Sequence, residues 1–198
     1  MKIGIMGGTF NPIHNGHIAL AQKAYEDLSL DKVLFMPSGT SYLKQNVLPA
    51  KHRVEMVQRA IADYPQFELS LIEVNRAGNT YTYETLQQLK KENSQTTYYF
   101  IIGADSLLSM EHWKEPEIIF SLAKIACAVR DDADMSVIKK KGKELEEKGA
   151  DIVYLDMPAI PISSTQIREF AKAHESITDL VSTEVAAYMQ EEHLYEED

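Results

Sequence analysis

Short apolar runs alternate with amphipathic stretches along most of the chain. The apolar runs are rich in Ile, Val, Phe and Tyr, which is typical of strands. They cover residues 2–6, 32–36, 67–74, 98–102, 124–129 and 151–155. Between them, apolar residues recur every three or four positions, as in Ile18, Ala21, Tyr25 and Leu28, which is typical of a helix packed on a core. This alternation predicts an α/β fold, a doubly wound parallel sheet with helices on both faces.

The last part of the chain is predicted to be helical. Ser163 followed by Gln166 fits a capping box at the start of one helix, and a second helix is expected over residues 183–193. The 198 residues are 44% hydrophobic and 25% charged, which is ordinary for a globular domain. We therefore expect one domain, residues 1–198, with a short helical portion over about residues 163–198.

Composition excludes several classes of protein. The single cysteine, Cys127, cannot form an internal disulfide, and its apolar neighbours predict a buried thiol. No apolar run approaches the length of a spanning helix and no signal peptide is recognisable, so a cytoplasmic protein without a membrane partner is expected. The net charge of −10 disfavours nucleic acid as a partner, whereas small anions remain compatible with it. The oligomeric state stays open, a homo-oligomer included.

The first candidate site follows the first predicted strand, where the chain reads G-G-T-F-N-P-I-H-N-G-H over residues 7–17. Asn15 is the expected N-cap of the next helix, which puts His17 in a first turn with unpaired N–H groups that suit a phosphate. His14 and His17 are three residues apart, so both can face one anion. A tight turn with two incidental histidines is the alternative. The spacing matches neither G-x-G-x-x-G nor G-x-x-x-x-G-K-[ST], which disfavours a nicotinamide-dependent dehydrogenase.

The second candidate site is the segment I-S-S-T-Q-I-R over residues 162–168. Its hydroxyls stand at a predicted helix start, and Arg168 follows one turn later, so both can hold a phosphate. A capped surface helix with a solvated arginine is the alternative. Arg53 and Arg130 are weaker phosphate candidates, and a plain surface position stays open for each.

Three further features can hold a second ligand. A helix start near Thr82 offers backbone N–H groups to a carboxylate. The segment I-I-G-A-D over residues 101–105 stands at a strand end, where ligands of doubly wound sheets bind. Trp113, the only tryptophan, can stack on a cationic ring. Each feature also has a purely structural interpretation: a capped helix for Thr82, a turn for residues 101–105, and core packing for Trp113. The remaining histidines lack the spacing of a zinc site, so no protein-held metal is expected.

The two motifs together resemble a known family. H-N-G-H is similar to the H-x-G-H signature of the nucleotidyltransferase superfamily, and the fuller string over residues 7–17 resembles bacterial nicotinate-nucleotide adenylyltransferases. Residues 162–168 match the I-S-S-T-x-I-R signature of that family, and residues 101–105 match its I-I-G-x-D. The resemblance covers essentially the whole chain. It implies a Rossmann-like fold of the nucleotidyltransferase type, and transfer of AMP from ATP to nicotinate mononucleotide with Mg²⁺ as cofactor.

The resemblance also implies roles for individual residues. His14, His17 and Arg168 are implied to be catalytic, with His17 donating to the α-phosphate. ATP binding is implied for Gly7, Gly8, Thr9, Phe10, His17, Gly103, Asp105, Ile162, Ser163, Ser164, Thr165 and Arg168. Binding of nicotinate mononucleotide is implied for Lys44, Tyr81, Thr82, Asp105 and Trp113.

The chain departs from the family pattern at three places. Asn11 stands where many members carry Asp, residues 41–43 replace a P-P-H segment, and Lys114 replaces an aromatic residue after Trp113. The last two bear on the acceptor side. Other functions therefore stay open: another adenylyl- or cytidylyltransferase, such as one acting on phosphopantetheine, or a non-catalytic nucleotide-sensing module.

Overall fold

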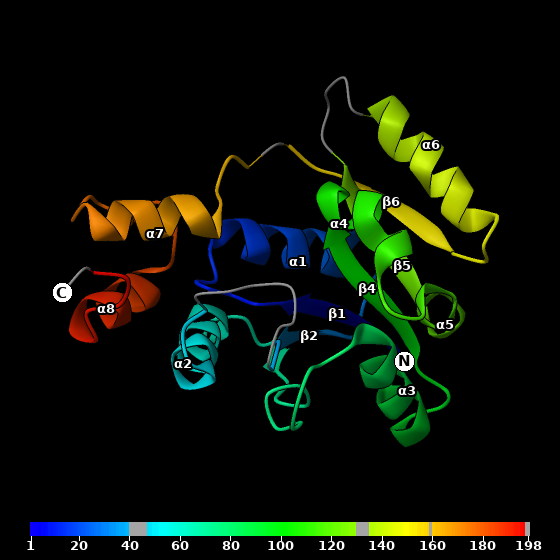
Figure 1. Cartoon of the computed structure of the whole chain (residues 1–198), viewed down its shortest axis with the longest axis horizontal. Coiled ribbons are helices and arrows are strands. Elements are labelled where there is room, and N and C mark those ends of the chain that lie inside the picture. Colours follow the sequence, from blue (N-terminus) through cyan, green and yellow to red (C-terminus); the bar gives the residue numbers. More distant parts are fainter. Residues whose placement is uncertain (40–46, 130–134, 159, 197–198) are drawn as a thin grey trace.

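The computed structural model describes residues 1–39, 47–129, 135–158 and 160–196. Its centre is a six-stranded parallel sheet with strand order β3-β2-β1-β4-β5-β6 (Figure 1). The strands are β1 (Lys2–Gly8), β2 (Lys32–Pro37), β3 (Phe67–Leu69), β4 (Thr97–Gly103), β5 (Ala123–Val129) and β6 (Ile152–Asp156). This is the predicted α/β class with a doubly wound sheet.

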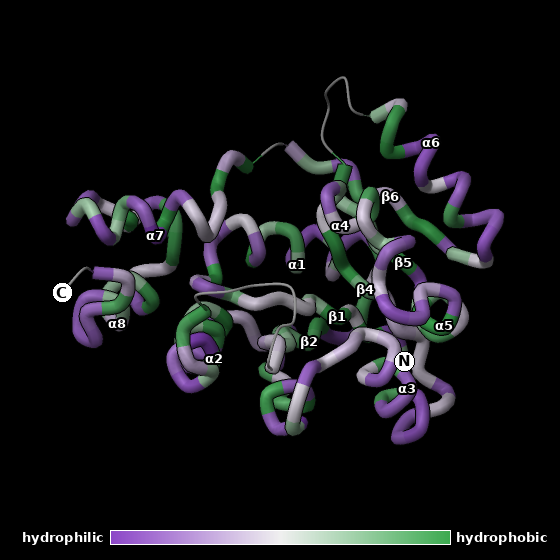
Figure 2. The backbone as a smooth tube through the Cα atoms, viewed as in Figure 1, coloured by the Kyte–Doolittle hydropathy of each residue, from purple (hydrophilic) through white to green (hydrophobic). Residues whose placement is uncertain are grey.

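Helices cover both faces of the sheet, as parallel strands require. They are α1 (Asn15–Asp27), α2 (Ala50–Ile61), α3 (Thr82–Glu92), α4 (Ala104–Ser109), α5 (Pro116–Leu122), α6 (Met135–Glu146), α7 (Ser164–Lys172) and α8 (Thr183–Glu191), with a 3-10 turn η1 (Met110–His112). Buried residues of α1, α2, α7 and α8 share one hydrophobic cluster, and those of α3 to α6 share the other. Figure 2 shows the result as hydrophobic strands between helices whose outer faces are hydrophilic.

Side chains of the central strands point alternately into the two clusters. In β4, Tyr99 and Ile101 join the cluster under α1, whereas Tyr98, Phe100 and Ile102 join the cluster under α3 and α5. This follows from the two-residue period of a strand. Both faces are therefore apolar, which explains why the sequence pattern shows continuous apolar runs instead of alternation.

Five of the six predicted strands are confirmed to within two residues at each end. The exception is the run 67–74, of which only Phe67–Leu69 is a strand. After Ser70 donates to the carbonyl of Phe35 at 2.8 Å, the backbone bonds become local, from Asn75 to Leu71 and from Arg76 to Glu73. Because β3 lies at the edge of the sheet, the chain beyond it can turn away, and this turn places Glu73 on the wall of a pocket.

The cysteine prediction is confirmed. Cys127 is fully buried in β5, and burial raises the pKa of its thiol to about 12. Within the described ranges, none of the helices combines the length and apolar character that crossing a bilayer requires.

We predict that Gly4→Ala destabilises the protein. An added Cβ would lie 2.8 Å from the terminal carbons of Ile101 and Leu30 and 3.1 Å from Val33, all of them buried. Overpacking of this kind costs about 1–3 kcal/mol of unfolding free energy, measurable by urea denaturation. Gly103→Ala is the matched control on β4, since nothing lies within 4 Å of its added Cβ. Equal stability of the two variants would contradict the packing argument.

Candidate functional site

The strand order determines where ligands can bind. In the sheet, β1 has β2 as its neighbour on one side and β4 on the other. The strand order therefore reverses between β1 and β4, and the ends of these two strands lie at a topological switch point. In open α/β sheets, ligands bind at the carboxyl ends of the strands at such a point. Two pockets open here, one on the α1 face of the sheet and one on the α3 face.

The pocket on the α1 face brings both sequence motifs together. It is lined by His14, Gly16, His17, Leu20, Gly103, Ala104, Ala128, Met157, Pro158, Ile160 and Ile162. The residues thus come from the start of α1, the ends of β4 and β5, and the segment that leads into α7. Of the predicted ATP-binding residues, His17, Gly103 and Ile162 line this pocket, together with the predicted catalytic residue His14.

The start of α1 differs from the prediction in one residue. The N-cap is His14, not Asn15, because the His14 backbone N–H donates to Nδ1 of His17, 3.2 Å away, in the manner of a capping box. Asn15 is instead the first helical residue, and its backbone N–H donates to the carbonyl of Leu180 at 2.9 Å. The imidazole rings of His14 and His17 have centroids 3.7 Å apart and planes inclined by 31°. Both rings therefore line the same pocket.

Burial determines the charge of His14. It lowers the pKa of the imidazole from 6.5 to about 4, so His14 is neutral at pH 7. Its Nδ1 is buried and has no hydrogen-bond partner among the described residues. A buried nitrogen without a partner is costly unless a ligand supplies one. This observation identifies the pocket as a place for a polar ligand.

The loop before α1 is fixed by its own packing. Phe10 is 2% exposed and places its ring edge-on to His17, with centroids 5.1 Å apart. A Cβ on Gly8 would lie 3.1 Å from the Phe10 ring, so this glycine makes room for Phe10. Gly7, Gly8 and Thr9 line the pocket on the α3 face.

The start of α7 is bonded directly to this loop. Ser164 Oγ donates to the carbonyl of Pro12 at 2.8 Å, and Arg168 donates to the carbonyl of Asn11 at 2.8 Å and to Thr165 Oγ1 at 3.2 Å. Ser163 caps the helix as predicted, accepting from the backbone N–H of Gln166. The two motifs, each predicted to hold a phosphate, thus meet in the structure, although Ser163, Ser164, Thr165 and Arg168 line neither pocket.

Arg53 is a residue whose role the sequence did not reveal. It is 2% exposed and donates to the carbonyls of Thr9 at 2.8 Å, Leu48 at 3.0 Å and Gly39 at 3.4 Å. Burial lowers the pKa of its guanidinium. Arg53 is therefore neither a phosphate contact nor a surface residue. Its guanidinium holds the backbone around the loop in place through these three hydrogen bonds. A single arginine at helical spacing in α2 carries no signal that could have shown this.

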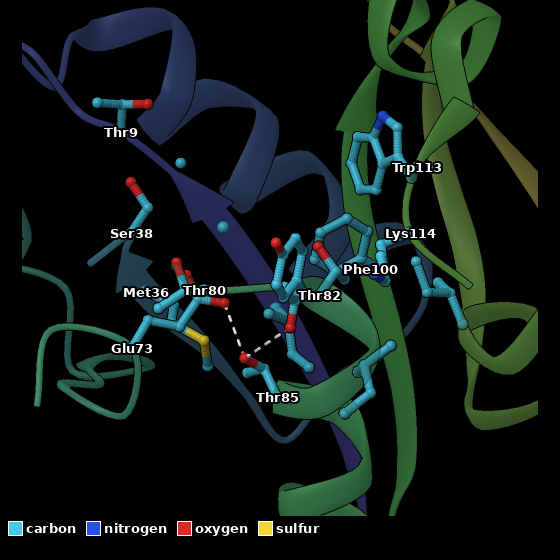
Figure 3. A pocket seen from close by; sticks show the side chains of 16 residues that line it. Thr9, Met36, Ser38, Glu73, Thr80, Thr82, Thr85, Phe100, Trp113 and Lys114 are labelled. Atoms are coloured by element: carbon cyan, nitrogen blue, oxygen red, sulfur yellow. Dashed lines mark hydrogen bonds between the residues drawn. The ribbon is translucent and has the colours of Figure 1, made fainter. Parts of the chain in front are cut away.

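The pocket on the α3 face holds most of the predicted acceptor residues. Figure 3 shows Trp113, Lys114 and Thr82 at one end and Thr9, Ser38 and Glu73 at the other. Tyr81 is the N-cap of α3, and Trp113 meets Phe100 edge-on with centroids 5.9 Å apart. Lys114, the departure from the family pattern, places Nζ 5.5 Å from the centre of the Tyr81 ring. It supplies the pocket wall with a positive charge.

Glu73 is the second residue that sequence reasoning missed. Its Oε1 accepts from Thr85 Oγ1 at 2.9 Å, and Arg76 also donates to that hydroxyl at 3.0 Å. Burial raises the pKa of Glu73, while the bonds from Thr85 and Thr80 and the charge of Arg76 oppose the rise. The carboxyl lies on the pocket wall because the chain turns after β3, at the place where the predicted strand was too long.

The other predicted residues fall elsewhere. Asp105 is exposed in the first turn of α4 and lines neither pocket. Lys44, residues 41–43 and Arg130 lie outside the described residues. Within the described part of the chain, no three His, Cys, Asp or Glu side chains form a group that could hold a metal ion.

Comparison with known proteins identifies relatives along the full length. A family model described as cytidylyltransferase-like matches residues 5–170. A probable nicotinate-nucleotide adenylyltransferase of Lachnoclostridium phytofermentans is 42% identical over 197 residues, and one of Clostridium tetani is 39% identical, each with 98% of both chains covered. The solved nicotinic acid mononucleotide adenylyltransferase of Plasmodium falciparum, complexed with NaAD, shares the fold, with a TM-score of 0.80 at 21% identity over 98% of this chain and 97% of that chain.

We predict that His14 makes stability depend on pH. Because its pKa is about 4 in the folded protein and 6.5 in the unfolded reference, the unfolded state binds the proton more tightly. Neutral His14 therefore contributes fully to the free energy of unfolding above pH 6.5, and this contribution is lost as the pH falls towards 4. Urea denaturation across this range should show a steeper loss for the wild type than for His14→Gln. Parallel curves, or an NMR titration midpoint of His14 near 6.5, would contradict the assignment.

Proposed function

The chain belongs to the nicotinate-nucleotide adenylyltransferase family, and on this premise we propose how its two pockets carry out the reaction. The enzyme transfers AMP from ATP to nicotinate mononucleotide, giving nicotinate adenine dinucleotide and pyrophosphate in NAD biosynthesis. In our proposal, ATP occupies the pocket on the α1 face and the mononucleotide occupies the pocket on the α3 face. The supporting observation is that the starts of α1 and α7 meet at one loop beside both pockets.

The ATP side relies on the two imidazoles and on the start of α1. This helix of 13 residues turns a positive dipole end to the phosphates, while the backbone N–H groups of Asn15 and His17 are already bonded to the carbonyls of Leu180 and His14. His17 donates to the α-phosphate oxygens as negative charge builds on them in the transition state. His14 lines the same pocket, and a phosphate oxygen accepting from its ring would raise the pKa of the imidazole again. Arg168 assists by fixing Asn11 and, with N–H groups left over, by reaching the leaving pyrophosphate.

The chemistry needs no side-chain base. The 5′-phosphate of the mononucleotide is already ionised at pH 7, and it attacks the α-phosphorus in line while the P–O bond to pyrophosphate breaks. Catalysis then consists of positioning and of stabilising charge. The strand ends between the pockets bring the two phosphates into line, because Gly7 and Gly8 border one pocket and Gly103 borders the other.

Mg²⁺ enters with ATP in this proposal. In nucleotide sites the ion takes most of its ligands from phosphate and water, which fits a pocket whose donors are imidazole and N–H groups. Bound there, it would neutralise phosphate charge and so ease the departure of pyrophosphate.

The pocket on the α3 face suits nicotinate mononucleotide because of its positive charge and its aromatic side chains. The start of α3, at Tyr81 and Thr82, offers N–H groups to the nicotinate carboxylate, and Lys114 adds a positive charge beside it. Trp113 offers its indole face to the pyridinium ring. A nicotinamide mononucleotide lacks the carboxylate, so we expect the acid to be the better substrate. Given the net charge of −10, we expect small molecules as ligands, not nucleic acid, and a cytoplasmic location.

We predict that His17→Ala lowers kcat by about 10²–10³ when pyrophosphate release is measured with ATP, Mg²⁺ and nicotinate mononucleotide. Removing a donor to the α-phosphate weakens the transition state more than the bound substrates. His174→Asn is the matched control, since His174 is exposed beyond α7 and takes a left-handed φ that Asn tolerates. An unchanged rate for folded His17→Ala would reject the role. Activity with phosphopantetheine only, or nucleotide binding without pyrophosphate release, would reject the proposed function.

We predict that Trp113→Ala separates the two substrates. The variant should raise the KM for nicotinate mononucleotide about 5- to 30-fold, because stacking on a cationic ring is worth roughly 1–2 kcal/mol in a desolvated site. The KM for ATP should stay within about twofold, since Trp113 does not line the pocket on the α1 face. Steady-state kinetics with each substrate varied in turn measure both constants. An equal rise in both would argue against two separate subsites.

A further inference from the structure

The loop from Thr9 to Pro12 is held by residues from four separate parts of the chain. Arg53 of α2 donates to the carbonyl of Thr9, and Arg168 of α7 donates to the carbonyl of Asn11. The side chain of Asn11 is held as well. Its Oδ1 accepts from the backbone N–H of Leu48 at 3.2 Å and from the hydroxyl of Tyr195 at 2.8 Å. The last bond joins residues 184 positions apart, and the reaction described above does not account for it.

Tyr195 is well suited to hold this bond. Burial raises the pKa of its phenol far above the usual value, against the opposing influence of Arg168 and Arg53, so the hydroxyl stays protonated and donates. The preceding Leu194 is 6% exposed and belongs to the hydrophobic cluster beneath α1, α2 and α8. The end of the chain is thus seated in the core before it reaches Asn11, beside α7 and α8 (Figure 1).

The backbone at both ends of this contact is strained. Tyr195 has a φ of 68° and Phe10, the neighbour of Asn11, has a φ of 50°. Bulky residues are strained in this left-handed region and persist there where the surroundings hold them in place. The bond therefore joins strained Tyr195 to the residue that follows strained Phe10. Phe10 in turn sets its ring against His17, at a centroid distance of 5.1 Å.

We propose that Tyr195 is a positioning residue for adenylyl transfer: through Asn11 and the strained Phe10, its hydroxyl sets the orientation of the His17 imidazole towards ATP. The expected effect on the reaction rate rests on the proposed function, whereas the expected effect on the orientation of the His17 ring does not. The hydroxyl contacts neither pocket. Its contribution is therefore made through the loop, and it should change kcat and leave acceptor binding alone.

Tyr195→Phe tests the proposal, since it removes the hydroxyl and keeps the ring. We expect kcat to fall about tenfold with the KM for nicotinate mononucleotide within twofold of wild type, because a small misplacement of a catalytic group is costly. Tyr188→Phe is the matched control. That tyrosine also belongs to the C-terminal part and loses a hydroxyl 2.9 Å from Nδ1 of His52. Among the described residues it makes no hydrogen bond to the loop, so the rate of this variant should stay unchanged.

A second variant removes the acceptor of the same hydrogen bond. Asn11→Ala should lower kcat at least as far as Tyr195→Phe, because it removes the bonds from both Tyr195 and Leu48. The double variant should be no slower than Asn11→Ala, since that substitution already removes the bond from Tyr195. Asn11→Asp keeps the acceptor oxygen beside Arg53 and Arg168 and should retain activity within about threefold. If Tyr195→Phe does not fold, the Ala and Asp variants at position 11 decide alone.

A readout without catalysis separates this proposal from the proposed function. The ring protons of His17 resonate under the influence of the Phe10 and His14 rings, so their NMR shifts report the orientation of the imidazole. Tyr195→Phe should move these signals, whereas Tyr188→Phe should not. The proposal is overturned if the shifts and kcat are unchanged in Tyr195→Phe, if its effect is multiplicative with that of Asn11→Ala, or if both tyrosine variants lose activity equally. An inactive wild type with moved His17 signals would reject only the proposed function.

Discussion

Two hydrogen bonds from α7 to the loop before α1 hold the candidate site together. Ser164 and Arg168 bind the carbonyls of Pro12 and Asn11, which lie 152 and 157 residues earlier in the chain. Without these bonds, α7 would be a helix on the edge of the fold, and the first pocket would lack the wall that contains Ile160 and Ile162. The doubly wound sheet forms a crevice at its strand ends. The contact between the starts of α1 and α7 closes one side of that crevice.

The charge distribution follows from the same contact. Arg53, which is buried, and Arg168, which is half-buried, donate to backbone carbonyls near the site, so they stiffen the loop and give it a positive field. The pocket itself is lined by the imidazoles of His14 and His17, and His14 is neutral at pH 7. A chain with a net charge of −10 can therefore accept a polyanion, since the local field at the loop and not the overall charge decides.

The sequence predicts the fold well because the signals are local. Apolar runs of strand length and helical periodicity identify five strands, and β3 fails because an edge strand can end while its apolar residues continue into a turn. Each motif is predicted to hold a phosphate, and the structure brings the two together. The sequence does not show the roles of Arg53 and Tyr195, which depend on partners distant in the chain, or that of Glu73, which reaches the pocket because the chain turns after β3. The roles of the pocket residues in binding stay predictions, and Asp105 stands apart from both pockets in the structure.

The single thiol has a practical consequence. Cys127 lies inside β5 with no exposed surface, and at neutral pH it carries almost no thiolate, the form that attacks electrophiles. The native protein should therefore tolerate alkylating and mildly oxidising conditions. A cysteine introduced on the surface would then be the one site that maleimide dyes modify, which permits single-position fluorescent labelling without first removing the natural cysteine.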